Sequence, residues 1–177
     1  IIHAYYLVYH HGQLDAAERT LQAVEQALDS SSDQTDDKGI QQDTNPNSEI
    51  KKLQGRAASI RAFMSSFRGD IPAILRYATQ ALEDLPEEEL TWRGFTSFAL
   101  ADAHGYRGAF VSAYHTHSAA LQAFEASGDI YFMLAANVKL ALTLRDQGQL
   151  QQAIEKCEQQ IEFVNKFGLS QTSLSGL

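Results

Sequence analysis

The sequence predicts an all-α fold made of about four antiparallel helix pairs. Apolar residues recur every three or four positions in almost every segment, which places them on one face of a helix. No comparable run alternates apolar and polar residues as a half-buried strand does. Four similar glycine-containing turns divide the helices, and the last three lie 39 and 40 residues apart. Such regular spacing indicates a helical repeat.

The expected helices can be placed in order along the chain. A first helix ends at Gly12. Segments with helical apolar spacing follow at 14–28, 60–67, 71–82, 95–103, 109–121, 134–142 and 150–161. The chain starts at Ile1 rather than Met and opens within a periodic segment, so we interpret residues 1–177 as one repeat domain and a piece of a longer protein.

The turns between paired helices share a pattern that close packing explains. They begin at Gly12, Gly69, Gly108 and Gly148. An apolar residue follows two positions later, and a small or aliphatic residue five positions later. Glycine accepts the left-handed conformation that ends a helix, and a small side chain lets the next helix approach closely. Each glycine is therefore expected to join two antiparallel helices.

The segment 29–48 interrupts the repeat. Its only aliphatic residue is Ile40, and its five aspartates outnumber Lys38. Such a segment buries too little apolar surface to offset the entropy lost on ordering, so we expect a flexible acidic insertion. An acidic docking segment or a calcium loop is the alternative, although the EF-hand pattern of ligands is absent.

The glycine turns, the pairs of about 40 residues and Pro86, which closes a helix, resemble the tetratricopeptide repeat. The segment 85–168 is similar, more narrowly, to the superhelical domain of MalT-like regulators in the LuxR family. Three stretches carry this resemblance: Leu85-Pro86-Glu87-Glu88 with Trp92-Arg93-Gly94, the turn Ala126-Ser127-Gly128-Asp129, and Gly148-Gln149-Leu150-Gln151-Gln152-Ala153 leading to Cys157.

The resemblance implies a right-handed superhelix that does no catalysis. In such regulators an ATPase module precedes the superhelix and a DNA-binding helix-turn-helix follows it. The superhelix would sense a small-molecule inducer or a regulatory protein and would contact the other domains of the same chain. A generic tetratricopeptide scaffold that binds a peptide or a partner helix is the alternative.

Composition and missing motifs argue against several classes of function. The net charge of −8 disfavours a nucleic-acid contact, because such binding needs Lys and Arg to replace counterions. The phosphate-binding GxxxxGK[ST] motif is absent, and we expect no cofactor here. No apolar run is long enough to cross a membrane, and a single cysteine fits a reducing cytoplasm.

The His, Glu and Cys residues considered as metal ligands or catalytic groups are expected to have structural roles. His115 and His117 lie two residues apart and diverge around a helix, so His117 is expected to be a partly buried or interface histidine and no metal site is expected. Glu87, Glu88 and Glu89 fit a helix start. Cys157 shares an apolar stripe with its neighbours and is expected to be a buried structural thiol.

The aromatic residues suggest a binding surface. The first helix of each pair should line the concave face of the superhelix. The candidate ligand- or partner-binding residues on that face are Arg56, Phe63, Phe67, Phe95, Phe98, Asp102, Tyr106 and Arg145. Aromatic faces beside charged groups suit a peptide, a helix or a small polar ligand. The alternative is that half or more of these aromatics fill the core, and Trp92 is expected to be a packing anchor.

Overall fold

The structure, a computed structural model, describes residues 1–32 and 46–166 and is all-α over both ranges. Its helices are α1 (Ile2–His11), α2 (Leu14–Ser32), α3 (Pro46–Arg68), α4 (Ile71–Asp84), α5 (Leu90–Tyr106), α6 (Phe110–Ser127), α7 (Ile130–Asp146) and α8 (Leu150–Lys166). None of these described helices has both the length and the hydropathy needed to cross a membrane. The predicted all-α fold is confirmed.

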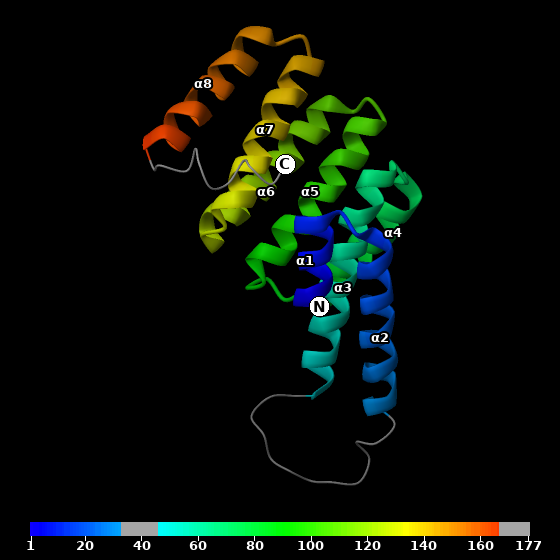
Figure 1. The fold of residues 1–177 in the computed structure, drawn as a ribbon. Coiled ribbons are helices and arrows are strands. Elements are labelled where there is room, and N and C mark those ends of the chain that lie inside the picture. The colour runs from blue at the N-terminus through cyan, green and yellow to red at the C-terminus, as the bar shows by residue number, and fades with distance from the viewer. Residues whose placement is uncertain (33–45, 167–177) are drawn as a thin grey trace.

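Consecutive helices form four pairs that stack into a superhelix (Figure 1). Helix α3 packs against its partner α4 and against α5 of the next pair, and α6 packs between α5 and α7. In Figure 1 α2 and α8 lie at opposite ends of the molecule, and α1 lies between them. The predicted architecture of about four antiparallel helix pairs is therefore confirmed for the described residues.

The glycine turns are confirmed where the sequence places them. Gly12, Gly69, Gly108, Gly128 and Gly148 have φ angles of 59°, 65°, 73°, 74° and 78°. At Gly128, which ends α6, the backbone N–H donates to the carbonyl of Glu125. A side chain at this φ would be strained, because a Cβ atom crowds the backbone in the left-handed region.

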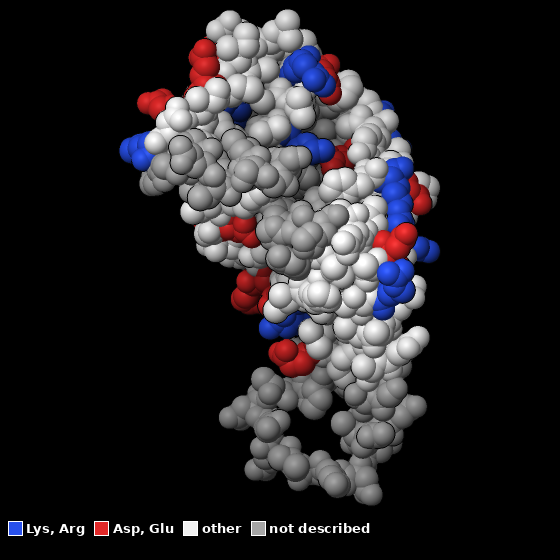
Figure 2. All heavy atoms as spheres, viewed as in Figure 1, with Lys and Arg blue, Asp and Glu red and all other residues white. Residues whose placement is uncertain are grey.

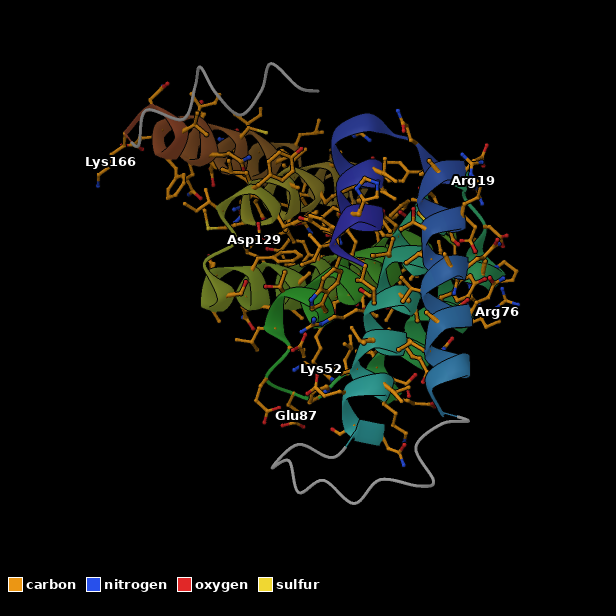
Figure 3. The ribbon with its side chains drawn as sticks, turned by 60° about the horizontal axis from the view of Figure 1, so that its bottom comes forward. Arg19, Lys52, Arg76, Glu87, Asp129 and Lys166 are labelled. Atoms are coloured by element: carbon orange, nitrogen blue, oxygen red, sulfur yellow. The ribbon has the colours of Figure 1, made fainter. Side chains whose placement is uncertain are left out.

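Aspartates begin two of the helices that follow these turns. The carboxylate of Asp70 accepts a hydrogen bond from the backbone N–H of Ala73 at 3.1 Å, and Asp129 accepts one from Phe132 at 3.2 Å. Figure 3 labels Asp129 at the connection between α6 and α7. Each aspartate satisfies an N–H that has no partner within the helix, so α4 and α7 begin at defined residues.

Helix α5 approaches α6 closely at Gly94. A Cβ atom at Gly94 would lie 2.9 Å from the ring of Phe124, whose side chain is fully buried. We expect Gly94→Ala to lower the free energy of unfolding by about 1–2 kcal/mol, although alanine favours the helix. Gly105→Ala on the same helix is the control, because a Cβ there meets nothing within 4 Å. In urea denaturation the Gly105→Ala variant should be as stable as the unchanged chain or more stable. Equal losses of free energy of unfolding in the two variants would contradict the packing argument.

An aromatic cluster lies at the centre of the stack and joins three pairs. The rings of Phe63 on α3 and Phe95 on α5 are 4.3 Å apart, and those of Phe95 and Phe132 on α7 are 4.7 Å apart. Phe124 of α6 stacks on Phe132 at 5.2 Å. These four side chains are buried, so residues far apart in the sequence share one core.

Charged residues attach α2 to α3. The guanidinium of Arg61 on α3 pairs with Glu18 at 2.9 Å and also with Glu25, both on α2. Arg61 is only 8% exposed, whereas both glutamates are partly exposed. A buried guanidinium needs such partners, since an unpaired charge away from water is costly.

The predicted insertion 29–48 is shorter in the structure at both ends. Helix α2 continues to Ser32, and α3 begins at Pro46. The ends of the predicted segment are therefore helical, because the flanking helices extend beyond their apolar stripes. The rest of the insertion, residues 33–45, lies outside the described residues.

Candidate functional site

Three of the predicted concave-face aromatics lie in the core instead. Phe63, Phe95 and Phe98 are 7%, 1% and 4% exposed. They contact one another and Phe132 of the next pair. The prediction that these rings line an open surface is corrected, because neighbouring helices cover them.

Helix α1 supplies part of this cover. The ring of Tyr5 lies 5.7 Å from Trp92, 5.7 Å from Phe95 and 6.1 Å from Phe132. Ala4 on the same helix is fully buried. Helix α1 therefore packs across residues of α5 and α7, and Trp92 is a packing residue as the sequence predicts.

Arg56 lies away from the other predicted site residues and is engaged in ion pairs. Its guanidinium donates two hydrogen bonds of 2.8 Å to the carboxylate of Glu89, and Lys52 lies 3.2 Å from the same carboxylate. Hydrogen bonds from Arg56 lower the pKa of Glu89. In Figure 3 Lys52 is labelled near Glu87, in the loop before α5.

Glu89 lies at a helix start, just before α5, as the sequence predicts, but its carboxylate does not cap the helix. The carboxylate is held by Arg56 and Lys52 of α3 instead. This contact connects neighbouring pairs, so Arg56 has a structural partner that the helix pattern alone does not reveal.

Two predicted residues, Asp102 and Tyr106, lie together toward the end of α5, beside the end of α3 and with one residue that the prediction missed. Tyr106 is 52% exposed, and its hydroxyl donates a 2.7 Å hydrogen bond to the carbonyl of Ser66. Phe67, the next residue along α3, is 63% exposed. Asp102, one turn before Tyr106, accepts a 2.7 Å hydrogen bond from Lys139 of α7. We call Phe67, Asp102, Tyr106 and Lys139 the Tyr106 cluster.

The Tyr106 cluster has a buried side and an open side. Asp102 is 8% exposed, and burial raises the pKa of its carboxyl while the Lys139 ammonium partly offsets this. Lys139 retains 35% exposure, and its ammonium lies 5.6 Å from the centre of the Phe98 ring. Burial, and then the nearby Asp102 carboxylate, raise the pKa of Tyr106. The cluster therefore combines exposed aromatic surface with a cation over a buried anion.

His117 lies behind this cluster, and its predicted burial is confirmed at 3% exposure. Its Nε2 atom is 3.7 Å from Asp102 Oδ1. Burial, with a smaller contribution from the Lys139 charge, lowers the pKa of His117 to about 3, so its ring is neutral at physiological pH. Its Nδ1 is the one buried side-chain nitrogen or oxygen without a hydrogen-bond partner among the side chains that the structure describes.

Arg145, the last predicted site residue, lines a different surface. An apolar groove of about 880 Å³ runs between α7 and α8, and Arg145 lies at its edge, paired with Asp146 at 2.7 Å. The principal apolar residues of this α7–α8 groove are Val138, Leu142, Leu150, Ile154, Cys157 and Ile161. Arg56, the Tyr106 cluster and the groove are thus three separate places.

The sequence prediction missed the α8 wall of this groove because it placed Cys157 on a buried apolar stripe with Ile154 and Ile161. Cys157 is exposed rather than buried, so the prediction of a buried thiol is corrected. Ile154 and Ile161 are 52% and 60% exposed. Their helical spacing correctly indicates one apolar face, but spacing does not show whether another helix covers that face.

Charged side chains of both signs are spread over the surface in Figure 2. Lys and Arg alternate with Asp and Glu, and neither sign forms an extended patch on the face in view. In the part of the chain that the structure describes, no group of three or more His, Cys, Asp or Glu side chains is arranged to hold a metal ion.

Comparison with known families gives one match. The family model described as the MalT-like TPR region, where TPR denotes the tetratricopeptide repeat, matches residues 55–177. Searches of curated proteins and of solved structures found no match. The family match covers more than half of the chain, from residue 55 within α3 through α4, α5, α6, α7 and α8. The chain therefore belongs to the family of MalT-like TPR regions.

Proposed function

We infer that residues 1–177 are the sensor and protein-interaction region of a MalT-like, LuxR-family, ATP-dependent transcriptional regulator. Membership of the MalT-like TPR family supports this inference. Helical repeats of this kind are in general non-catalytic, and we propose no enzymatic activity and no cofactor for this region. Its partners would be an inducer or a regulatory protein and the other domains of a cytoplasmic regulator, without direct contact to nucleic acid.

We propose that the effector binds at the Tyr106 cluster, on the face shared by the first helices of the pairs. The observation that carries this proposal is that exposed Tyr106 lies beside the ion pair of Lys139 and Asp102, while its hydroxyl binds the carbonyl of Ser66, the residue before exposed Phe67. Aromatic rings bury apolar surface of a ligand and so stabilise its binding, and the charged groups orient the polar part of the ligand. Helices α3, α5 and α7 all contribute, so a ligand there would bridge three pairs.

Binding would act by shifting a conformational equilibrium of the regulator. A ligand changes such an equilibrium only if it binds one state more tightly than the other. A contact that spans three helix pairs meets this condition if the pairs rotate relative to one another between states. The free-energy coupling expected for such allosteric effects is about 1–3 kcal/mol.

Variants of the cluster test this site. A thermal-shift screen of sugars, amino acids and acyl metabolites first identifies a ligand that raises the melting temperature. We expect Tyr106→Ala and Phe67→Ala each to weaken that ligand by about tenfold while the helical circular-dichroism signal stays normal. Val111→Ala on α6 is the control, because Val111 is 66% exposed and outside the cluster. Unchanged affinity in both cluster variants, measured by calorimetry, would place the ligand elsewhere.

A generic TPR scaffold that binds a partner helix is the second candidate. The α7–α8 groove favours it, because an open apolar groove suits an amphipathic helix. The full gene product distinguishes the two candidates. A phosphate-binding loop upstream and a helix-turn-helix downstream support the regulator, and a complete chain without them supports the scaffold.

A further inference from the structure

The charge that the Tyr106 cluster presents to solvent is positive. The side chain of Lys139 is 35% exposed, whereas Asp102 is 8% exposed. The Asp102 carboxylate accepts a hydrogen bond of 2.7 Å from the Lys139 ammonium. The buried anion therefore already has a cation, and a ligand that arrives from solvent meets the ammonium.

Lys139 keeps hydrogen-bond donors for a ligand. An ammonium has three N–H groups, and Asp102 accepts from one of them. Among the described residues, the Lys139 ammonium makes no second ion pair or hydrogen bond. It lies 5.6 Å from the centre of the Phe98 ring, which is 4% exposed. Lys139 can therefore donate to a second acceptor that approaches from its exposed side.

Tyr106 offers apolar surface next to this cation. It lies four residues after Asp102, so the two side chains are neighbours on one face of α5. The Tyr106 hydroxyl donates a hydrogen bond of 2.7 Å to the carbonyl of Ser66, which holds the half-exposed ring in one direction. Such a ring can pack against a planar apolar group. A ligand that contacts Lys139 and Tyr106 together therefore needs a hydrogen-bond acceptor beside an apolar group.

We propose that the effector bound at the Tyr106 cluster is a monocarboxylate with an apolar body, whose carboxylate accepts hydrogen bonds from Lys139. This inference rests on the proposed function, because it names the class of ligand for the same site. Hydrogen bonds between an ammonium and a carboxylate are stronger than those between neutral groups. A cationic ligand would be repelled by the exposed ammonium, and Asp102 is too buried to bind it directly.

One negative charge on the ligand suits this site better than two. Lys139 contributes one positive charge, and Asp102 Oδ1 already lies 2.7 Å from its ammonium. A ligand anion on the same ammonium would therefore lie close to a second carboxylate. The Asp102 carboxylate would repel a phosphate dianion about twice as strongly as a carboxylate, because the Coulomb energy is proportional to the charge.

The buried carboxylate connects anion binding to pH. Burial raises the pKa of Asp102, and Lys139 lowers it, with a smaller lowering from Ser66 of α3. The other titratable groups that face Asp102 are His117 of α6 and Tyr106, and both are neutral at pH 7. An anion on Lys139 adds a like charge near Asp102 and raises this pKa further. Binding should therefore be coupled to proton uptake and should become tighter as the pH falls.

Three compounds that differ in one group test the ligand class. Phenylacetate, phenethyl alcohol and phenethylamine share a benzene ring and carry a carboxylate, a hydroxyl group and an ammonium. Calorimetry with the whole chain at pH 7 should show that phenylacetate binds at least about tenfold more tightly than either of the others. Equal affinities for phenylacetate and phenethyl alcohol, or tighter binding of phenethylamine, would overturn the proposal.

The pH dependence gives a second readout of the same binding. The affinity for phenylacetate should rise when the pH is lowered from 7 to 6, and buffers of different ionisation enthalpy should show proton uptake. Phenylacetate itself stays ionised in this range, because an exposed carboxyl group has a pKa of about 4. Asp102→Asn removes the titrating group and should abolish this dependence while binding becomes tighter, since the competing carboxylate is gone. Proton release on binding would overturn the proposal.

Matched lysine variants show whether the carboxylate binds Lys139. Lys139→Met should weaken phenylacetate binding by at least about tenfold, and Lys139→Arg keeps the charge and should retain binding. Lys51→Met is the control, because Lys51 is exposed and lies near the opposite end of α3 from the cluster. Equal losses of affinity in Lys139→Met and Lys51→Met would mean that phenylacetate responds only to net charge. Circular dichroism without ligand checks that each variant is folded.

The site and the ligand class can fail separately. If Tyr106→Ala weakens the binding of phenethyl alcohol or phenethylamine and phenylacetate does not bind, the site is supported and the carboxylate class is wrong. If phenylacetate depends on Lys139 but the ligand from the thermal-shift screen is insensitive to Tyr106→Ala and Phe67→Ala, the cluster binds carboxylates and is not the effector site. Phenylacetate binding that is insensitive to both Tyr106→Ala and Lys139→Met would overturn this inference.

Discussion

Phe95→Ala is expected to lower the free energy of unfolding by about 3–5 kcal/mol, the range for removing a fully buried aromatic ring. Phe95 is 1% exposed and lies between Phe63 at 4.3 Å and Phe132 at 4.7 Å. Tyr5 and Trp92 also contact its ring. Truncation would leave a cavity where three helix pairs meet, and the surrounding rings belong to separate helices that cannot all move inward.

Phe67→Ala is the matched control for this prediction. Phe67 is 63% exposed, and its ring contacts Phe63 at 4.9 Å. We expect its truncation to cost less than about 1 kcal/mol, as for other exposed side chains. Urea denaturation followed by circular dichroism compares the two variants. If Phe95→Ala were no less stable than Phe67→Ala, the ring would not be part of the core, and a binding role for Phe95 would have to be considered again.

The helices and their turns follow closely from the sequence. Gly69, Gly108 and Gly148 mark the helix ends because a left-handed residue is required there, and that requirement is local. The apolar spacing of three and four residues is also local, since it depends only on the geometry of one helix. These features therefore predict the number and order of the helices in the described ranges.

The coverage of each apolar face could not be predicted in the same way. Phe95 and Tyr106 both lie on α5, but Tyr5 and Phe132 cover the first and leave the second exposed. Tyr5 is 90 residues away in the sequence, and helix spacing contains no information about such a contact. The predicted site residues therefore divide into core and surface according to tertiary packing.

Cys157 is the opposite case, a residue that was expected to be buried and is exposed. Its apolar neighbours repeat the pattern of α6, whose equivalent face is buried by α7. The spacing correctly indicates an apolar face on α8, and burial of that face needs a further helix. Lys139 was missed for another reason, because its role depends on Asp102 of the preceding pair.

Lys139→Met is expected to lower the free energy of unfolding by about 2 kcal/mol at pH 7, less than for a fully enclosed ion pair. Lys139 donates a 2.7 Å hydrogen bond to Asp102, which is 8% exposed. Methionine keeps most of the packing against Phe98 but leaves the buried carboxylate without its cation. The effect is moderate because Lys139 is 35% exposed and its charge is partly screened by water.

The loss of stability in Lys139→Met should depend on pH with a definite sign. Burial already raises the pKa of Asp102 in the folded chain, and the Lys139 ammonium opposes this rise. Without Lys139 the folded pKa rises further above the unfolded value of about 3.9. The folded state then holds its proton more tightly than the unfolded state, so stability falls as pH increases through this window. The loss in free energy of unfolding caused by Lys139→Met should be largest near pH 7 and should become smaller toward pH 4.

The double variant Lys139→Met/Asp102→Asn isolates the carboxylate as the cause. Asparagine has a similar shape and no charge, so the pH-dependent part of the loss should disappear relative to Lys139→Met. His117 adds a pH dependence of the opposite sign in both variants, because its folded pKa is lowered to about 3 and only the unfolded chain takes up this proton between pH 7 and pH 4. Urea denaturation of both variants from pH 4 to pH 7 separates the two groups. A deficit that stayed constant over this range in Lys139→Met would mean that lost packing on Phe98, rather than the buried charge of Asp102, destabilises the chain.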